Sequence, residues 1–312
     1  MAKVLVVGSI NCDISVYCDR HPAAGETVTG HDFAISLGGK GANQAVASKL
    51  CGAESHLLAR VGDDSNGRDM LARLNKRGVD TSDVRQAKEF ITGTALITVD
   101  QTGENRIVVI AGANEALDAA DINHAKSSFR SADLVLVQCE IPAATVAEAV
   151  LLSAHVGTPI AINPSPVDRV SLETLQACSY IIINEIEAES LSSVAVTDAV
   201  SAQKCLDVLG RQGLSCVILT LGSDGCIYSS GDYRRHFLAP DLRAVDTTGA
   251  GDAFLGCFAA YTAGKATNEQ AISRAVAFAS ASTRRCGAQE SYLDMDQLEA
   301  FIKEFPPRVT PT

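Results

Sequence analysis

Near its start the chain reads Val4-Leu5-Val6-Val7, the first of several short runs of Val, Ile and Leu. Similar runs recur at Asp133–Val137, Pro159–Ile162, Tyr180–Ile183 and Cys216–Thr220. An unbroken apolar run of this kind is typical of a strand that is covered on both faces, as in a parallel sheet. These runs therefore predict the strands of a buried, mostly parallel sheet.

Segments with helical spacing separate and follow these runs; they are Thr145–Ala154, Ala199–Arg211, Asn268–Arg284 and Asp296–Glu304. Strands that alternate with helices favour an α/β fold, here a doubly wound, mostly parallel sheet with helices on both faces. Beyond the last helix, residues 306–312 are expected to be loosely held.

Two stretches break this pattern, from about residue 14 to 35 and from about residue 92 to 110. Apolar and polar residues alternate there, and turn residues such as Gln101-Thr102-Gly103-Glu104 interrupt them. This pattern predicts a small β-sheet lid that could close over a substrate. The alternatives are a hairpin without a function or a surface that pairs with a second copy through its open edge, and the lid could also serve both purposes. Because no linker or repeat is visible, we expect residues 1–312 to form a single domain that contains the lid.

Composition narrows the class of protein. The chain has 312 residues, of which 46% are hydrophobic, enough for a substantial core. A net charge of −11 without a long basic run argues against a nucleic-acid groove, which needs clustered Lys and Arg. No apolar run approaches the ~20 residues that cross a bilayer, and the apolar start is too short for a signal peptide, so we expect a cytoplasmic protein with no membrane partner.

Cysteine and histidine show no metal-binding pattern. None of the ten cysteines lies in a CxxC pair, and most fall inside apolar runs, where they behave as small hydrophobic residues. The six histidines are scattered without the i, i+4 spacing of a transition-metal site.

The candidate for catalysis is the run Asp246-Thr247-Thr248-Gly249-Ala250-Gly251-Asp252, which an apolar stretch follows directly. Small residues before a buried helix let backbone N–H groups converge on an anion at the positive end of that helix. An acid in such a place would repel a phosphate unless it accepts a proton from an attacking hydroxyl, and this is the role we expect for Asp252. The alternative, an aspartate that only caps the helix, stays open on these residues alone.

Two further groups of polar residues suit a sugar. Asn11 and Asp13 follow the first strand and, being two residues apart, should point to the same side, although an Asx turn is the alternative for this pair. The run Leu37-Gly38-Gly39-Lys40-Gly41-Ala42-Asn43 lacks the Ser or Thr after Lys40 that a Walker A loop requires, so it does not predict a P-loop. It still allows a ligand to approach the backbone closely, although a tight turn explains it equally well.

A third group suits a nucleotide. In Asn184-Glu185-Ile186-Glu187, the acid Glu187 is placed to orient a water bound to Mg²⁺, or else to stabilise the start of a helix. The turn Thr220-Leu221-Gly222-Ser223-Asp224-Gly225 follows a buried strand at the same edge of the sheet.

Together these motifs resemble the ribokinase-like (PfkB) family of carbohydrate kinases over nearly the whole chain, in the order Leu37–Asn43, Asn184–Glu187 and Asp246–Asp252. By this resemblance Asp252 is the catalytic base, and the amides of Gly249, Ala250 and Gly251 form an anion hole. The resemblance implies sugar contacts from Asn11, Asp13, Gly39, Lys40, Asn43, Glu140 and Asp252. It implies ATP contacts from Asn184, Glu187, Thr220, Gly222, Gly225 and Gly251. It implies a monovalent-cation site, suited to K⁺, at Asp246, Thr248, Ser282, Arg285, Gly287 and Ser291.

Two positions depart from the family pattern. Val276 stands where many members place Asn or His beside the adenine, and Glu290 stands where Pro is common. The resemblance implies ATP-dependent phosphorylation of the terminal (O5) hydroxyl of D-ribose, with Mg²⁺ and K⁺, by a homodimer that pairs through the lid. Alternatives are a kinase for another furanose or for a nucleoside, or a catalytically silent sugar-binding protein.

Overall fold

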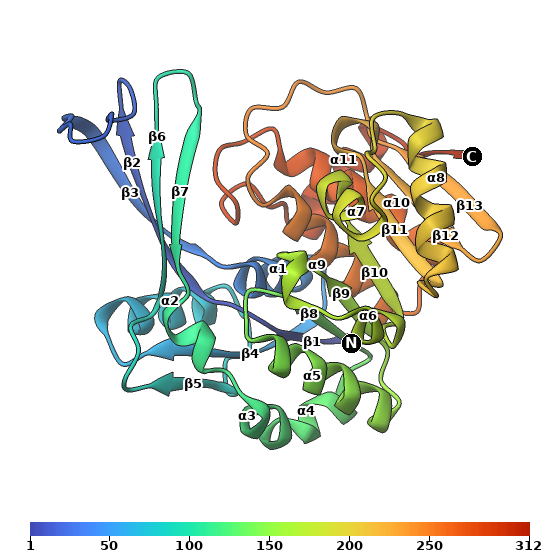
Figure 1. Ribbon diagram of the computed structural model, residues 1–312, viewed down its shortest axis with the longest axis horizontal. Coiled ribbons are helices and arrows are strands. Elements are labelled where there is room, and N and C mark those ends of the chain that lie inside the picture. The colour runs from blue at the N-terminus through green and yellow to red at the C-terminus, as the bar shows by residue number, and fades with distance from the viewer.

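The computed structural model describes residues 1–312 and contains two β-sheets (Figure 1). The larger sheet has ten strands in the order β14-β13-β12-β11-β10-β9-β8-β1-β4-β5, and the smaller has four in the order β3-β2-β6-β7. The larger sheet consists of β1 (Lys3–Val7), β4 (Glu54–Gly62), β5 (Val84–Ala87), β8 (Leu134–Gln138), β9 (Ile160–Asn163), β10 (Tyr180–Ile183), β11 (Cys216–Thr220), β12 (Cys226–Ser230), β13 (Tyr233–Leu238) and β14 (Arg308–Pro311). The smaller sheet consists of β2 (Asn11–Cys18), β3 (Gly30–Gly38), β6 (Gly93–Val99) and β7 (Asn105–Ile110).

Helices cover both faces of the larger sheet (Figure 1). They are α1 (Lys40–Leu50), α2 (Ser65–Lys76), α3 (Ala119–His124), α4 (Lys126–Ser131), α5 (Ala143–Val156), α6 (Leu172–Gln176), α7 (Glu185–Ser192), α8 (Ala199–Arg211), α9 (Ala250–Ala263), α10 (Asn268–Ser282) and α11 (Met295–Glu304).

Side chains of each central strand alternate between two separate cores, as the pleat of a strand requires. In β1, Val4 and Val6 pack with helices α1, α2, α9, α10 and α11, whereas Leu5 and Val7 pack with α3 to α8. The neighbours of β1 run parallel to it, with Val4 opposite Ser55 in β4 and Leu134 in β8. The expected doubly wound, mostly parallel sheet is therefore confirmed.

One edge of the larger sheet differs from the expectation. From β11 onward the strands are antiparallel, and the last of them, β14, pairs with β13, with Val309 opposite Phe237. Within residues 306–312, which were expected to be loosely held, the expectation was wrong for residues 308–311, because the edge of β13 offers backbone donors and acceptors with which they pair.

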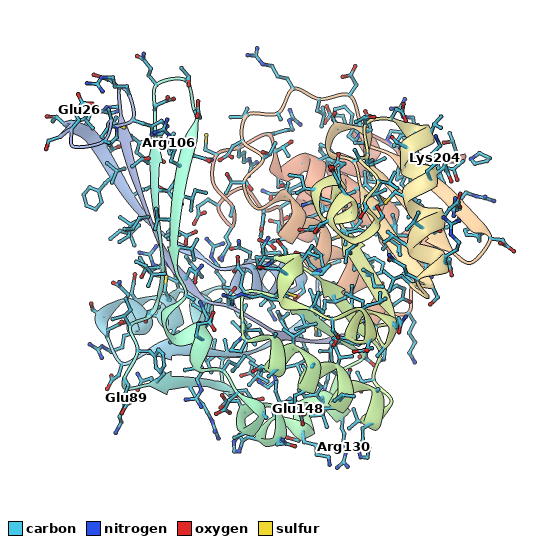
Figure 2. The ribbon with its side chains drawn as sticks, viewed as in Figure 1. Glu26, Glu89, Arg106, Arg130, Glu148 and Lys204 are labelled. Atoms are coloured by element: carbon cyan, nitrogen blue, oxygen red, sulfur yellow. The ribbon has the colours of Figure 1, made fainter.

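The smaller sheet projects from the larger one, and Glu26 and Arg106 mark its outer end (Figures 1 and 2). Its strands overlap the two stretches where the sequence predicts alternating strands, although β2 begins three residues before the first stretch and β3 ends three residues after it. β2 pairs antiparallel with β3 and parallel with β6, and β6 pairs antiparallel with β7. We call residues 11–38 and 93–110 the lid sheet.

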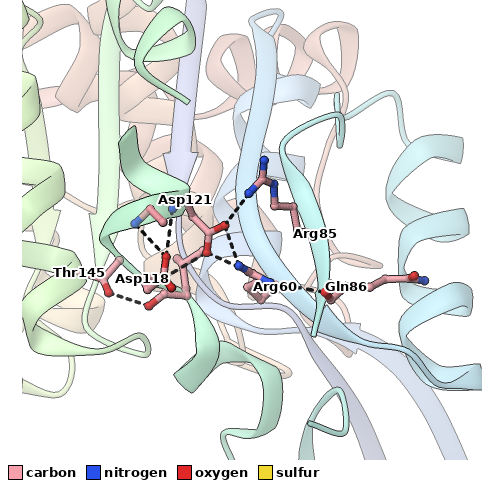
Figure 3. Close-up of polar contacts among 8 residues, drawn as sticks. Arg60, Arg85, Gln86, Asp118, Asp121 and Thr145 are labelled. Carbon is pink, nitrogen blue, oxygen red and sulfur yellow. Dashed lines mark hydrogen bonds and ion pairs between the residues drawn. The ribbon is translucent and has the colours of Figure 1, made fainter. Parts of the chain in front are cut away.

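An ion cluster around a buried aspartate fixes α3 against the other edge of the larger sheet (Figure 3). Asp121 of α3 is buried and accepts two hydrogen bonds from Arg60 of β4, at 2.8 and 2.9 Å, while Arg85 of β5 lies 3.4 Å away. Thr145 of α5 donates to the Leu117 carbonyl at 2.6 Å. A buried carboxylate is tolerated here because both of its oxygens are paired.

Among the helices, none combines the length and apolar character of a membrane span. The cytoplasmic location stays a prediction.

Candidate active site

The turn before α9 exposes backbone donors at the start of that helix. Gly249 has φ 74°, and a Cβ on it would lie 2.6 Å from the Cβ of Ala288, so only glycine fits there. The amides of Gly249, Gly251 and Asp252 donate no hydrogen bond within the protein, whereas the amide of Ala250 donates to the Thr247 carbonyl at 3.2 Å. Of the three amides expected to form an anion hole, those of Gly249 and Gly251 are free, whereas that of Ala250 closes the turn. The amide of Asp252 is a further free donor that the sequence analysis did not include.

Asp252 and Gly251 line a cavity that several elements share. A Cβ on Gly251 would meet no atom within 4 Å, so the backbone there is open to a ligand. The lining residues are Lys40, Asn163, Ile182, Ile183, Asn184, Glu187, Thr220, Gly249, Gly251, Asp252 and Leu255. Predicted residues from four distant parts of the sequence thus meet in one place.

Both carboxylate oxygens of Asp252 accept hydrogen bonds from α1. Asn43 Nδ2 donates to Oδ2 and Gln44 Nε2 donates to Oδ1, each at 2.9 Å. These donors hold a negatively charged side chain that is almost completely buried. The interpretation of Asp252 as only a helix cap does not account for these two bonds, because its partners belong to another helix.

Two glutamines that the sequence analysis missed lie behind these donors. Gln138, at the end of β8, donates to Gln44 Oε1 at 2.7 Å, and Gln289 donates to Asn43 Oδ1 at 2.8 Å. Gln138, Gln289 and the donor Gln44 are all buried. A sequence signal existed for Gln138, because the apolar run of β8 ends on this polar residue.

The start of α1 binds the carboxylate of Glu140. Glu140 Oε2 accepts from Ser9 Oγ at 2.6 Å and from the backbone N–H of Lys40 at 3.1 Å. The free amides and dipole at a helix start stabilise such a carboxylate. Gly39 has φ 87°, and a Cβ on it would lie 2.8 Å from the backbone N of Asn11. Only glycine therefore allows the chain to enter α1 at this point.

Lys40 carries a positive charge into this acidic region. Burial lowers the pKa of its ammonium group, but the charges of Asp252, Glu140 and Glu187 outweigh burial and raise that pKa above its usual value.

Asp13 and Asn11 begin β2 of the lid sheet. Asp13 Oδ1 is buried and has no hydrogen-bond partner. Burial, and then the negative charges of Glu140, Asp252 and Glu290, raise the pKa of Asp13 to about 7. Asn11 Oδ1 accepts from Asn114 Nδ2 at 2.8 Å, so Asn11 is already held within the protein.

Asn184 and Glu187 form a reciprocal cap at the start of α7. Glu187 N–H donates to Asn184 Oδ1 at 2.9 Å, and Asn184 N–H donates to Glu187 Oε2 at 3.0 Å. Asn163, which the sequence analysis missed, donates to the same oxygen at 3.2 Å. The helix-start interpretation of this motif is therefore correct, and Glu187 Oε1 still makes no hydrogen bond while the residue lines the cavity.

The remaining predicted nucleotide residues lie outside this cavity. Gly225 has φ 87°, and a Cβ on it would lie 2.0 Å from the Phe237 carbonyl oxygen, so its packing alone explains the glycine. Gly222 has open space around it. Val276 lines a second cavity between β13, α10 and the C-terminal segment, and the two cavities share no residue.

The predicted cation ligands come from two segments that lie side by side. Asp246 accepts from the amide of Thr248 at 2.9 Å and from the amide of Gly287 at 2.8 Å, and its own amide bonds the Thr283 carbonyl. Burial alone would raise the pKa of Asp246, but these hydrogen bonds lower it below its usual value. Ser282 and Ser291 are buried in the same region, whereas Arg285 is exposed. No group of three or more His, Cys, Asp or Glu side chains is arranged to hold a metal ion.

The chain is similar to known proteins over most of its length. A model of the pfkB family of carbohydrate kinases matches residues 1–295. A ribokinase of Mus musculus is 36% identical over 296 residues, which cover 93% of this chain and 92% of that protein. A deoxyribokinase of Salmonella typhi is 33% identical over 300 residues, which cover 96% of this chain and 98% of that protein.

Among solved structures, the ribokinase of Arabidopsis thaliana complexed with ribose and ATP is similar, with a TM-score of 0.89 and 28% identity. The match covers 97% of this chain and 99% of that one. The family model, the two relatives and this structure all span most of the chain, so the protein belongs to the pfkB family of carbohydrate kinases.

Proposed function

We propose that this protein transfers the γ-phosphoryl group of ATP to the terminal (O5) hydroxyl of D-ribose. The observation that carries the proposal is the cavity in which Asp252, the free amides at the start of α9, Lys40 and Glu187 meet. Relatives named ribokinase and a neighbour complexed with ribose and ATP support the choice of substrates.

In this proposal Asp252 accepts the proton of the sugar hydroxyl as its oxygen attacks phosphorus. The free amides of Gly249, Gly251 and Asp252 donate hydrogen bonds to the transferring phosphoryl group, whose negative charge the N-terminus of α9 also favours. Because a fixed donor needs no reorganisation during the reaction, such groups stabilise the transition state more than water does.

On the sugar side we assign contacts to Asn11, Asp13, Gly39, Lys40, Asn43 and Glu140. The unpartnered Oδ1 of Asp13 supports this assignment most directly, because a buried acceptor without a donor is costly and a sugar hydroxyl would supply the donor.

On the nucleotide side we assign contacts to Asn184, Glu187, Thr220, Gly222, Gly225 and Gly251. The oxygen-only donor set suits Mg²⁺, which would be held by the phosphates and, through water, by the unbonded Oε1 of Glu187. When bound, Mg²⁺ neutralises charge on the phosphates.

A second candidate substrate is 2-deoxy-D-ribose, because one of the similar relatives is named deoxyribokinase. A site built around hydroxyl donors disfavours a sugar that lacks one of them, since a buried polar group then loses its partner. We therefore expect ribose to be preferred, by about tenfold or more in kcat/KM.

The direct test is an ATP-turnover assay over ribose, 2-deoxyribose, other furanoses and nucleosides, with the wild type and Asp252→Asn. Wild type should turn over ribose best, and Asp252→Asn should lose about 10²–10⁴-fold in kcat because an amide cannot accept the proton. Calorimetry should show that the variant still binds ribose. An active Asn variant would refute the assigned base, and a wild type inactive on every sugar would favour a silent sugar-binding protein.

The raised pKa of Asp13 predicts that ribose binding is coupled to proton release. Hydroxyl donors favour the ionised carboxylate, so at a pH below about 7 binding should displace the proton from Asp13, and affinity should rise as pH increases towards 7. Calorimetry at pH 6 in buffers with different ionisation enthalpies measures the protons released. Asp13→Asn is the matched control and should release none; equal release by both proteins would contradict the assignment.

We also propose that K⁺ activates the enzyme through Asp246, Thr248, Ser282, Arg285, Gly287 and Ser291. Support comes from the two hydrogen-bonded segments, since a cation there would adjoin the turn that leads to Gly249. Both carboxylate oxygens of Asp246 already accept amide hydrogen bonds, so backbone carbonyls would supply much of the coordination.

Replacing K⁺ by tetramethylammonium at constant ionic strength should lower kcat about tenfold or more, because the bulky cation cannot enter the site. Steady-state kinetics with dialysed enzyme measures the effect, and restored K⁺ should restore the rate. Equal rates with both cations would rule out the ion site.

Finally, we propose a homodimer that pairs through the lid sheet. Every residue of β7 is exposed at the edge of the sheet, and Val108 and Phe33 are 63% and 66% exposed. Exposed apolar edge strands are suited to pairing with another copy.

Light scattering coupled to size exclusion should give a dimer mass for the wild type and a monomer mass for Val108→Glu combined with Phe33→Glu, because charge is unfavourable in an apolar interface. Val200→Glu on α8 is the matched control, since Val200 is 64% exposed, and it should stay dimeric. A monomeric wild type, or a dimeric double variant, would exclude this interface.

A further inference from the structure

The hydrogen bonds around Asp252 have a fixed direction. Gln138 Nε2 donates to Gln44 Oε1, which leaves the Gln44 amide group only its N–H to present to Asp252 Oδ1. On the other side Gln289 Nε2 fixes Asn43 in the same way. If the side-chain amide of Asn43 or Gln44 were reversed, its carbonyl oxygen would face the Asp252 carboxylate, and two acceptors in contact are unfavourable.

The two series of hydrogen bonds, from Gln138 through Gln44 and from Gln289 through Asn43, differ in how close they lie to the proposed sugar site. Asn43 is a proposed sugar contact, whereas Gln44 is fully buried and lines neither of the two cavities described above. Gln138 is also fully buried, and a Cβ on Gly8 would lie 1.9 Å from its Oε1, so the absence of a side chain at residue 8 makes room for it. Gln44 and Gln138 can therefore influence a reaction only through Asp252.

We infer that Gln44, held by Gln138, is a positioning residue for Asp252. This inference rests on the proposed function. Gln44, which lines neither cavity, holds Oδ1 from the core side. The donor to Oδ2 is Asn43, a proposed sugar contact, so we assign Oδ2 to receive the proton of the sugar hydroxyl. Oδ2 has two lone pairs and can accept this proton while it still accepts the Asn43 N–H. As the new bond from sugar oxygen to phosphorus forms, the bond to ADP breaks and the proton resides on Oδ2.

The hydrogen bonds from Gln289 through Asn43 to Asp252 are linked to residues outside the site. Arg77, directly after α2, donates to the Gln289 carbonyl at 3.2 Å and lies 3.3 Å from Glu290. Arg73, one turn earlier in α2, donates to the Ile35 carbonyl in the lid sheet at 3.2 Å. The Gln289–Asn43 chain is thus tied to surface elements, whereas the Gln138–Gln44 chain lies wholly in the core, which makes Gln44 the cleaner residue to test.

The decisive variant is Gln44→Met, which keeps the length of the side chain and removes the donor. We expect kcat to fall about 10- to 100-fold, as small misplacements of a catalytic group do, with the KM values for sugar and ATP changed less than about threefold. Gln176→Met is the matched control: Gln176 is exposed on α6 and also donates one hydrogen bond, to the Gln212 carbonyl at 2.7 Å. It should keep wild-type kinetics.

Two outcomes would overturn the inference. One is a folded Gln44→Met, judged by its thermal unfolding, with kcat within about twofold of wild type. The other is a rise in both KM values that matches the loss in kcat, which would mark a general structural defect. If Gln44→Met does not fold, Gln138→Met is judged by the same criteria, since it releases Gln44 without touching Asp252. Loss of activity in Asp252→Asn but not in Gln44→Met would overturn this inference and leave the proposed function standing.

Discussion

The site depends on the pair of hydrogen bonds that Asp252 of α9 accepts from Asn43 and Gln44 of α1. They join residues more than 200 positions apart in the chain. The two helices approach closely enough because residue 256 is a glycine: a Cβ there would lie 2.4 Å from the Cβ of Ala47 and 2.6 Å from the Gln44 carbonyl oxygen. A carboxylate can be buried only where such donors reach it. The close packing of α1 against α9 is therefore what allows Asp252 to be ionised in the site.

Charge in the site is unevenly distributed. Four carboxyl groups influence one another or Lys40 through their charges; they belong to Asp13, Glu140, Glu187 and Asp252. Lys40 is the one cation that lines the cavity. The acidic side repels an anionic substrate, which is the physical reason that a neutral sugar fits the proposed site better than a sugar that already carries phosphate. The free amides at the start of α9 and the Lys40 ammonium are then the groups available to the phosphates of a nucleotide.

Much of the fold could be predicted because its signal is local. The apolar runs at Val4–Val7 and Cys216–Thr220 became central strands, since a strand with two covered faces needs an unbroken apolar sequence. The strand β14 could not be predicted, because Val309 lies in a proline-rich segment and becomes a strand only by pairing with the edge of β13. The glutamines behind Asp252 were missed for a similar reason: nothing within a few residues of Gln289 indicates that its partner is Asn43.

By itself the sequence determined the α/β class, the lid strands and the residue types that could hold a sugar and a nucleotide, because periodicity and short motifs depend on neighbours along the chain. Only the tertiary structure decided which amides at the start of α9 are free, that Asp13 has an unpartnered oxygen and that Asn184 and Glu187 cap one another. Hydrogen-bond partners and desolvation are set by groups distant in sequence, so they become definite only when α1, α9 and the ends of the parallel strands are packed together.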